Sequence, residues 1–202
     1  MVAPTYLFLA LITGLPVKVL FRLRASGKEH LPREGGYVLS SNHISNFDPW
    51  PLGLPLFPRQ LRFMAKVELF RSPLWPILRY GGAFKVSRGE GDIEAIKTAI
   101  RLVREGEAVA IFPEGTRRSK GLVKRRQARP HKGAARIALE AGVPLIPAAI
   151  AGTDQLTRLG PLRVAYGPPV ALDDLRELDM REGARIGTER LMDAIGELEA
   201  TL

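Results

Sequence analysis

The sequence contains no cysteine and only three histidines among its 202 residues. Without cysteine there is no disulfide framework and no thiolate nucleophile, and only histidines and carboxylates remain as candidate zinc ligands. The G-x-S-x-G, H-E-x-x-H and phosphate-loop motifs are also missing. These absences exclude the common serine and cysteine nucleophiles, and the sequence predicts neither a metal nor another cofactor.

A long uninterrupted apolar run is missing too. About 20 apolar residues are needed to span a bilayer, whereas Pro16 and Lys18 interrupt the run that begins at Tyr6. No acidic residue precedes Glu29, and the cations of this segment follow the apolar run, which is the reverse of a cleaved secretory signal. Two interpretations are open: a helix packed on the domain, or a segment in the membrane interface with its cations at the headgroups.

The composition favours one domain with a substantial core, because 46% of the residues are hydrophobic at this chain length. We predict an N-terminal membrane-interface segment over residues 1–26 and one folded domain over residues 27–202. Lys and Arg number 30 against 21 Asp and Glu, which gives a net charge of +9. This charge draws the protein toward anionic partners: nucleic acid, an anionic membrane or a phosphorylated ligand.

Strand patterns and helix patterns alternate along the chain. Strand patterns cover residues 37–41, 62–66, 83–88, 108–112, 143–152 and 163–170, and helical spacing covers residues 92–105, 132–142 and a last helix from about Thr188. This alternation predicts an α/β fold: a single layered domain with a largely parallel or mixed sheet covered by helices, preceded by an N-terminal apolar or amphipathic helix. In such sheets the ligand crevice lies beyond the carboxyl ends of the strands. The stretches "NHISNFD" and "PEGTRRS" both follow predicted strands.

His43 and Asp48 form the first candidate reactive pair. Residues five apart on a regular helix differ by about 140° in azimuth, so the two side chains can meet only across a turn. Asp48 followed by Pro49 is also a good helix start, and one interpretation is that Asp48 only caps that helix. An ionised carboxylate has about four acceptor sites, so a cap and a histidine contact are compatible. A histidine held by an aspartate is a general base for a hydroxyl that attacks a carbonyl, and without a protein nucleophile that hydroxyl belongs to a substrate.

Four blocks occur in order: "NHISNFD" (42–48), "GGAFKVSR" (81–88), "FPEGTRRS" (112–119) and "VPLIPAAI" (143–150). They resemble the blocks of the glycerolipid acyltransferases, in particular the 1-acylglycerol-3-phosphate acyltransferases. The "HKG" before the helix that starts at Gly133 also has the look of this family. The second block departs from the family pattern, since Lys85 and Ser87 stand where apolar and acidic residues are usual.

The resemblance implies transfer of a fatty acyl group from an acyl thioester, acyl-CoA or acyl carrier protein, to the sn-2 hydroxyl of 1-acylglycerol 3-phosphate (lysophosphatidate). The product would be phosphatidate, in phospholipid biosynthesis, with no cofactor besides the acyl donor. His43 would take the hydroxyl proton and Asp48 would orient His43. Lys66 is the candidate stabiliser of the thioester oxyanion, beside backbone N–H groups near Gly115; a solvated strand-end lysine is the alternative.

The resemblance also assigns a site for the acceptor phosphate. Arg88 and Arg117 are its candidate clamps, because a guanidinium binds phosphate bidentately; surface charges are the alternative. Glu114 would bond the acceptor hydroxyl or fix Arg117. Gly115 and Thr116 complete this phosphate-binding block, Gly115 for a turn or a close backbone approach.

The sequence indicates the acyl pocket and the identity of the acceptor less directly than it indicates the reactive pair. Ile146 and Pro147 are candidates to line the acyl pocket, although a buried strand has the same pattern. Other acyl acceptors stay open: glycerol 3-phosphate, another lysophospholipid or a glycolipid hydroxyl. A hydrolase that uses His43 and Asp48 on water is a further alternative.

The basic run from Arg117 to Lys132 holds eight Lys or Arg residues and no acid. Binders of single-stranded nucleic acid interleave aromatic residues for base stacking, and this run has none, so we expect no nucleic-acid partner. The run is a solvated loop or a contact for anionic headgroups, coenzyme A phosphates or the acidic acyl carrier protein. We expect a peripheral or monotopic protein at the cytoplasmic face of the cell membrane.

Overall fold

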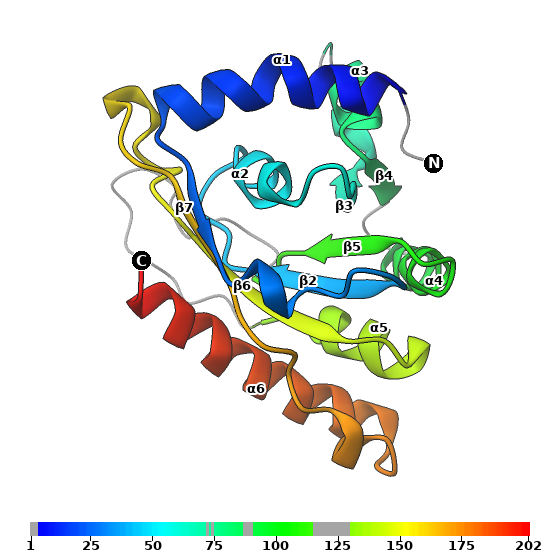
Figure 1. The fold of residues 1–202 in the computed structure, drawn as a ribbon. Helices are drawn as coiled ribbons and strands as arrows, with labels where there is room; N and C mark the ends of the chain where they lie inside the picture. The colour runs from blue at the N-terminus through cyan, green and yellow to red at the C-terminus, as the bar shows by residue number, and fades with distance from the viewer. Residues whose placement is uncertain (1–3, 72, 74, 87–90, 115–129) are drawn as a thin grey trace.

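The computed structural model describes residues 4–71, 73, 75–86, 91–114 and 130–202. Seven strands form one sheet in the order β1-β7-β6-β2-β5-β3-β4 (Figure 1). The strands are β1 (Arg24–Ser26), β2 (Tyr37–Ser41), β3 (Leu61–Lys66), β4 (Ala83–Val86), β5 (Ala108–Ile111), β6 (Leu145–Ala151) and β7 (Arg163–Tyr166). The α-helices are α1 (Pro4–Leu20), α2 (Pro49–Gly53), α3 (Trp75–Tyr80), α4 (Gly91–Arg104), α5 (Gly133–Ala141) and α6 (Met180–Ala200).

The sheet is mostly parallel, which confirms the predicted α/β class. Of the strand pairs that the structure describes, only β6 and β7 are antiparallel. β2 lies between β5 and β6, with Leu39 level with Ala110 on one side and Ile146 on the other. Because β2, β3, β5 and β6 run in one direction, the loops after all four leave from the same edge of the sheet.

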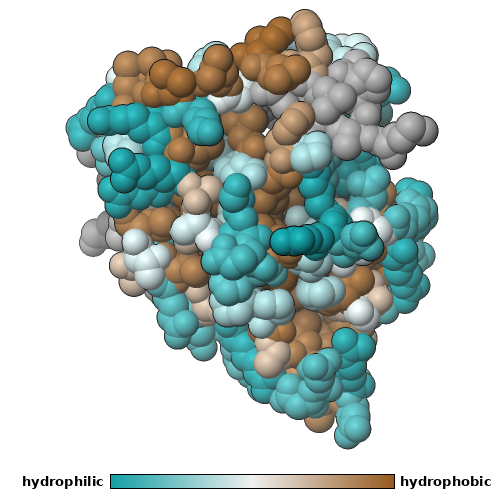
Figure 2. Space-filling view, in the orientation of Figure 1, coloured by the Kyte–Doolittle hydropathy of each residue, from teal (hydrophilic) through white to brown (hydrophobic). Residues whose placement is uncertain are grey.

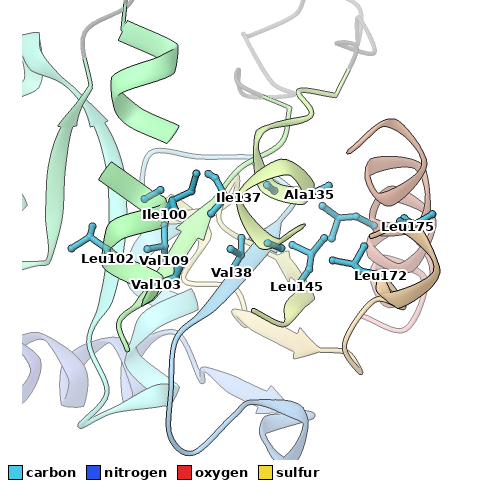
Figure 3. Close-up of a cluster of buried hydrophobic side chains, with 14 of the residues drawn as sticks. Val38, Ile100, Leu102, Val103, Val109, Ala135, Ile137, Leu145, Leu172 and Leu175 are labelled. Atoms are coloured by element: carbon cyan, nitrogen blue, oxygen red, sulfur yellow. The ribbon is translucent and has the colours of Figure 1, made fainter. Parts of the chain in front are cut away.

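Helices cover both faces of the sheet. On one face lie α4, α5 and α6, and on the other lies α2, with α1 beyond it (Figure 1). Figure 3 shows the buried cluster of the first face, where Val38 of β2 and Val109 of β5 meet Ile100 of α4 and Ile137 of α5. The predicted helix over residues 92–105 is confirmed as α4, and Gly106 follows it with φ 88°, a left-handed conformation that glycine adopts without steric cost.

The start predicted for the last helix, near Thr188, is wrong, since α6 begins at Met180. Asp179 caps it by accepting hydrogen bonds from the backbone N–H groups of Arg181 (3.0 Å) and Glu182 (3.4 Å). The first turns contain glycines, which are weak helix formers, but their bare backbone allows close packing. A Cβ on Gly187 would lie 3.1 Å from Leu172 and 3.2 Å from Ala135. Tertiary packing therefore sets the start of this helix.

The N-terminal segment ends in a strand that the sequence did not reveal. β1 pairs in parallel with β7, Arg24 opposite Arg163, so a partner rather than a local pattern defines it. None of the described helices is long and apolar enough to cross a membrane. α1 nevertheless forms a band of hydrophobic surface at the top of Figure 2. Its exposed apolar side chains are Phe8, Leu11, Ile12, Leu15, Val19 and Leu20.

Candidate active site

The turn after β2 brings His43 and Asp48 together, as the sequence predicted. Nδ1 of His43 lies 2.7 Å from Oδ2 of Asp48. The Asp48 side chain is fully buried, and the His43 side chain keeps 18% of its surface exposed. An ionised carboxylate only accepts hydrogen bonds, so Nδ1 carries the proton and Nε2 is the nitrogen that can take one. No residue in the described part of the chain hydrogen-bonds to Nε2.

Asp48 is held by four donors. Oδ2 accepts from His43 and from the backbone N–H groups of Ile44 (2.7 Å) and Ser45 (2.9 Å), and Oδ1 accepts from the Thr153 hydroxyl (2.6 Å). Asp48 stands at the N-cap position of α2, but its side chain makes no cap hydrogen bond there. The expected side-chain cap is therefore wrong: the carboxylate turns back onto the loop that carries His43.

Helix α2, which follows Asp48, is fastened to the sheet at its far end. The Tyr166 hydroxyl of β7 donates a 2.7 Å hydrogen bond to the Leu52 carbonyl. Burial, with a smaller contribution from nearby Tyr37, raises the pKa of the Tyr166 hydroxyl well above its usual value. The hydroxyl therefore stays protonated as a donor at physiological pH, and the chain after Asp48 is held in place.

Phe112, which begins the "FPEGTRRS" block, meets the first block at this edge of the sheet. β5 lies beside β2 in parallel, with Ile111 level with Ser40. The Phe112 ring therefore stacks on the His43 ring, with centroids 4.3 Å apart and planes inclined by 20°. Two residues on, Glu114 keeps only 5% of its surface exposed. The structure thus brings His43, Asp48 and Phe112 together, with Glu114 buried two residues beyond Phe112, and the function assigned to Glu114 stays a prediction.

The remaining predicted polar residues are placed only in part. Lys66 ends β3, whose residue Phe63 is level with Ala110 of β5, so its backbone lies at the same edge as His43. The phosphate-site residues Arg88, Gly115, Thr116 and Arg117 fall outside the described residues. The oxyanion and phosphate assignments therefore stay predictions. Within the described ranges, no group of three or more acidic or histidine side chains is placed to hold a metal ion.

Ile146 and Pro147 lie in the interior of β6. Ile146 is fully buried in the cluster that includes Leu39 and Tyr37. The Pro147 carbonyl accepts a 2.8 Å hydrogen bond from the backbone N–H of Gly167. These positions are those that the buried-strand alternative requires, and the acyl-pocket assignment stays a prediction.

Asn42 links strands and a helix behind the His43–Asp48 pair, a function that the sequence did not suggest. Its side-chain amide bonds both backbone groups of Ile150: Nδ2 donates to the carbonyl (2.9 Å), and Oδ1 accepts from the N–H (2.8 Å). Nδ2 also donates to Oε1 of Glu199, near the end of α6 (2.6 Å). Asn42 thereby ties the end of β2 to β6 and to α6, which fixes the backbone that carries His43.

The N-terminal segment contacts α2 and the loop before it. The indole N–H of Trp50 donates a 2.9 Å hydrogen bond to the Thr13 hydroxyl of α1. The Phe47 ring lies 6.2 Å from the Phe21 ring and 6.3 Å from the Trp50 ring, measured between centroids. Side chains around α1 therefore pack against the segment between His43 and α2.

Known proteins resemble this chain over nearly its whole length. The Acyltransferase family profile matches residues 22–151. The chain is 36% identical, over 92% of its length and 94% of the relative, to the 1-acyl-sn-glycerol-3-phosphate acyltransferase of Bacillus subtilis. It is 27% identical to the enzyme of the same name from Streptococcus pneumoniae, over 96% of this chain and 74% of the relative. The crystal structure of the LPA acyltransferase PlsC from Thermotoga maritima superposes with a TM-score of 0.63 at 24% identity, covering 96% of this chain and 86% of that one, which confirms the fold.

Proposed function

The chain belongs to the acyltransferase family, and we propose that it transfers a fatty acyl group from an acyl thioester to the sn-2 hydroxyl of lysophosphatidate. The product is phosphatidate, which places the enzyme in phospholipid biosynthesis. The observation that carries the chemistry is the 2.7 Å contact between His43 Nδ1 and Asp48 Oδ2 at the carboxyl edge of the sheet. The acceptor is assigned from the relatives of Bacillus subtilis and Streptococcus pneumoniae, whose names state 1-acylglycerol 3-phosphate.

His43 acts as the general base in this proposal. Its Nε2 takes the proton of the acceptor hydroxyl while the hydroxyl oxygen attacks the carbonyl carbon of the thioester. The tetrahedral intermediate then loses the thiolate as the carbon–sulfur bond breaks, and the proton passes from His43 to the leaving sulfur. Asp48, oriented by its four hydrogen-bond donors, stabilises the imidazolium between these two steps.

Other residues stabilise the intermediate and bind the two substrates in this proposal. Lys66 and backbone N–H groups near Gly115 stabilise the oxyanion of the intermediate. Arg88 and Arg117 clamp the acceptor phosphate, Gly115 and Thr116 contribute to the same function, and Glu114 bonds the acceptor hydroxyl or fixes Arg117. Ile146 and Pro147 line the acyl pocket. Acyl-CoA and acyl carrier protein are both suitable donors, because the basic run 117–132 complements the phosphates of one and the acidic surface of the other.

The acceptor assignment predicts a strong preference for a phosphorylated acceptor. With acyl-CoA as donor, we expect kcat/KM for lysophosphatidate to exceed that for monoacylglycerol by at least about 10²-fold, since hydrogen bonds to charged groups contribute about 1.5–3 kcal/mol each. Mass spectrometry of the lipid products, with glycerol 3-phosphate, lysophosphatidylcholine and a glycolipid as further acceptors, measures the preference. More efficient transfer to one of these reassigns the substrate, and thioester loss without a new ester indicates a hydrolase.

We further propose that the N-terminal segment, residues 1–26, binds the cytoplasmic face of the membrane as a peripheral or monotopic anchor. Leu11 and Leu15 are 69% and 68% exposed on α1, the helix that forms the hydrophobic band at the top of Figure 2. Exposed apolar area of this extent is unfavourable in water and is typical of a surface that enters a lipid interface. Lys18, Arg22 and Arg24 at the end of this segment suit anionic headgroups.

The anchor proposal predicts a loss of membrane binding when α1 loses its apolar side chains. A full-length variant carrying Leu11→Glu and Leu15→Glu is expected to bind anionic vesicles at least about 10²-fold more weakly, since burying each leucine contributes about 1.5–3 kcal/mol. Vesicle sedimentation measures the binding. Leu178→Glu is the matched control, because Leu178 is an exposed leucine two residues before α6, and α6 covers the face of the sheet opposite to α1 (Figure 1). Undiminished sedimentation of the double variant excludes α1 as the anchor.

A further inference from the structure

We propose that Thr153 is a positioning residue of the reaction, which holds the Asp48 carboxylate in the orientation that Asp48 needs to hold His43. The Thr153 hydroxyl donates a 2.6 Å hydrogen bond to Oδ1 of Asp48. Only 2% of Thr153 and none of Asp48 is exposed, so water does not replace this donor. The inference rests on the proposed function of His43 as the general base.

The pairing of strands in the sheet, not the local sequence, brings Thr153 next to Asp48. β6 runs parallel to β2, with Ala148 level with Ser41, so the chain that leaves β6 reaches the edge where the His43 loop begins. Gly152 then turns the chain with φ 91°. A Cβ at Gly152 would lie 2.4 Å from the Pro161 carbonyl oxygen, which leaves room only for glycine. The turn before Thr153 is therefore tightly fixed.

The distribution of donors gives Thr153 a distinct function. Three donors converge on Oδ2: His43 Nδ1–H and the N–H groups of Ile44 and Ser45. On Oδ1, the Thr153 hydroxyl is the donor that the described residues supply. A carboxylate that rotates about its Cβ–Cγ bond exchanges its two oxygens. A donor on each oxygen opposes this rotation, and it also stabilises a negative charge that is shielded from water.

Loss of this donor slows the reaction. The carboxylate turns more freely, so His43 spends less time in the tautomer and orientation that expose a basic Nε2. Substrate binding does not depend on this orientation, so the effect falls on kcat rather than on KM.

The test compares Thr153→Val, which removes the hydroxyl at constant shape, with Thr153→Ser, which keeps it. In the full-length protein, Thr153→Val is expected to lower kcat about tenfold and to change KM by less than about twofold. Thr153→Ser restores most of kcat. Thr157→Val, at an exposed threonine of the same loop, is the control.

A second measurement makes this inference separable from the proposed function. In the free protein, NMR of ¹⁵N-labelled histidine reports the proton on His43 Nδ1 without any substrate. We expect Thr153→Val to shift this signal and Thr153→Ser to leave it near the wild-type position. Equal effects of valine and serine, or a lower kcat with an unmoved Nδ1 signal, would overturn the positioning function. If the Nδ1 signals shift as expected but the protein shows no acyl transfer, the positioning function of Thr153 is supported and only the proposed function is refuted.

Discussion

Replacing His43 by alanine is expected to lower kcat for acyl transfer by about 10²–10⁴-fold, the usual contribution of a general base. Nδ1 is bound to Asp48 at 2.7 Å, so Nε2 is the nitrogen that accepts the proton of the attacking hydroxyl. Alanine removes that acceptor, and the pair no longer returns a proton to the leaving thiolate. Thiol release and lipid product, both followed at saturating substrate, measure the loss.

His30→Ala is the matched control for this substitution. His30 is an exposed histidine at the end of the short 3₁₀-helix Lys28–His30, so its removal is expected to leave kcat unchanged. Thermal unfolding of both variants checks that the fold survives. If His43→Ala keeps kcat within about twofold of the wild type, His43 is not the base, because general base catalysis contributes far more than that.

Replacing Asp48 by asparagine is expected to lower kcat by about 10²–10⁴-fold as well, since base catalysis depends on the tautomer that Asp48 fixes. The neutral amide no longer stabilises the imidazolium. It also presents an NH₂ group where all four neighbours donate: the ring N–H of His43, the N–H groups of Ile44 and Ser45, and the Thr153 hydroxyl. A buried donor left unsatisfied costs about 1–3 kcal/mol, so the free energy of unfolding falls too.

The assay of Asp48→Asn is therefore run well below its own melting temperature. The control is Asp154→Asn, at an exposed aspartate next to Thr153. We expect this control to retain the kcat and the stability of the wild type. An Asp48→Asn protein that is folded and transfers acyl groups at nearly the wild-type rate contradicts a catalytic His43–Asp48 pair.

Helices and strands with a strong local pattern could be predicted from the sequence. Segments that depend on pairing or packing with a distant part of the chain could not. The helical spacing after residue 92 and the buried run after residue 108 correspond to α4 and β5. β1 has three residues and exists because β7 pairs with it. The early start of α6 depends on glycines that pack against Leu172 and Ala135, a tertiary contact that local helix propensity opposes.

The candidate site likewise has a part that the sequence could predict and a part that it could not. The spacing of His43 and Asp48 permits a contact across one turn, and the resemblance to the acyltransferases favours that contact over a simple helix cap. Thr153 is separated from Asp48 by 105 residues, and Ile150 from Asn42 by 108. The pairing of β2 with β6 brings both pairs together, and neither a threonine hydroxyl nor a backbone amide leaves a signature that sequence spacing can reveal.

Direct transfer, with no acyl group resting on the protein, is the central claim, and one measurement tests it directly. The purified protein is incubated with acyl-CoA, with and without lysophosphatidate, while free thiol, phosphatidate and the mass of the intact protein are followed together. The account predicts thiol and phosphatidate in equal amounts, little thiol without the acceptor, and an unchanged protein mass throughout. Thiol released equally fast without lysophosphatidate, or a protein heavier by one acyl group, contradicts it.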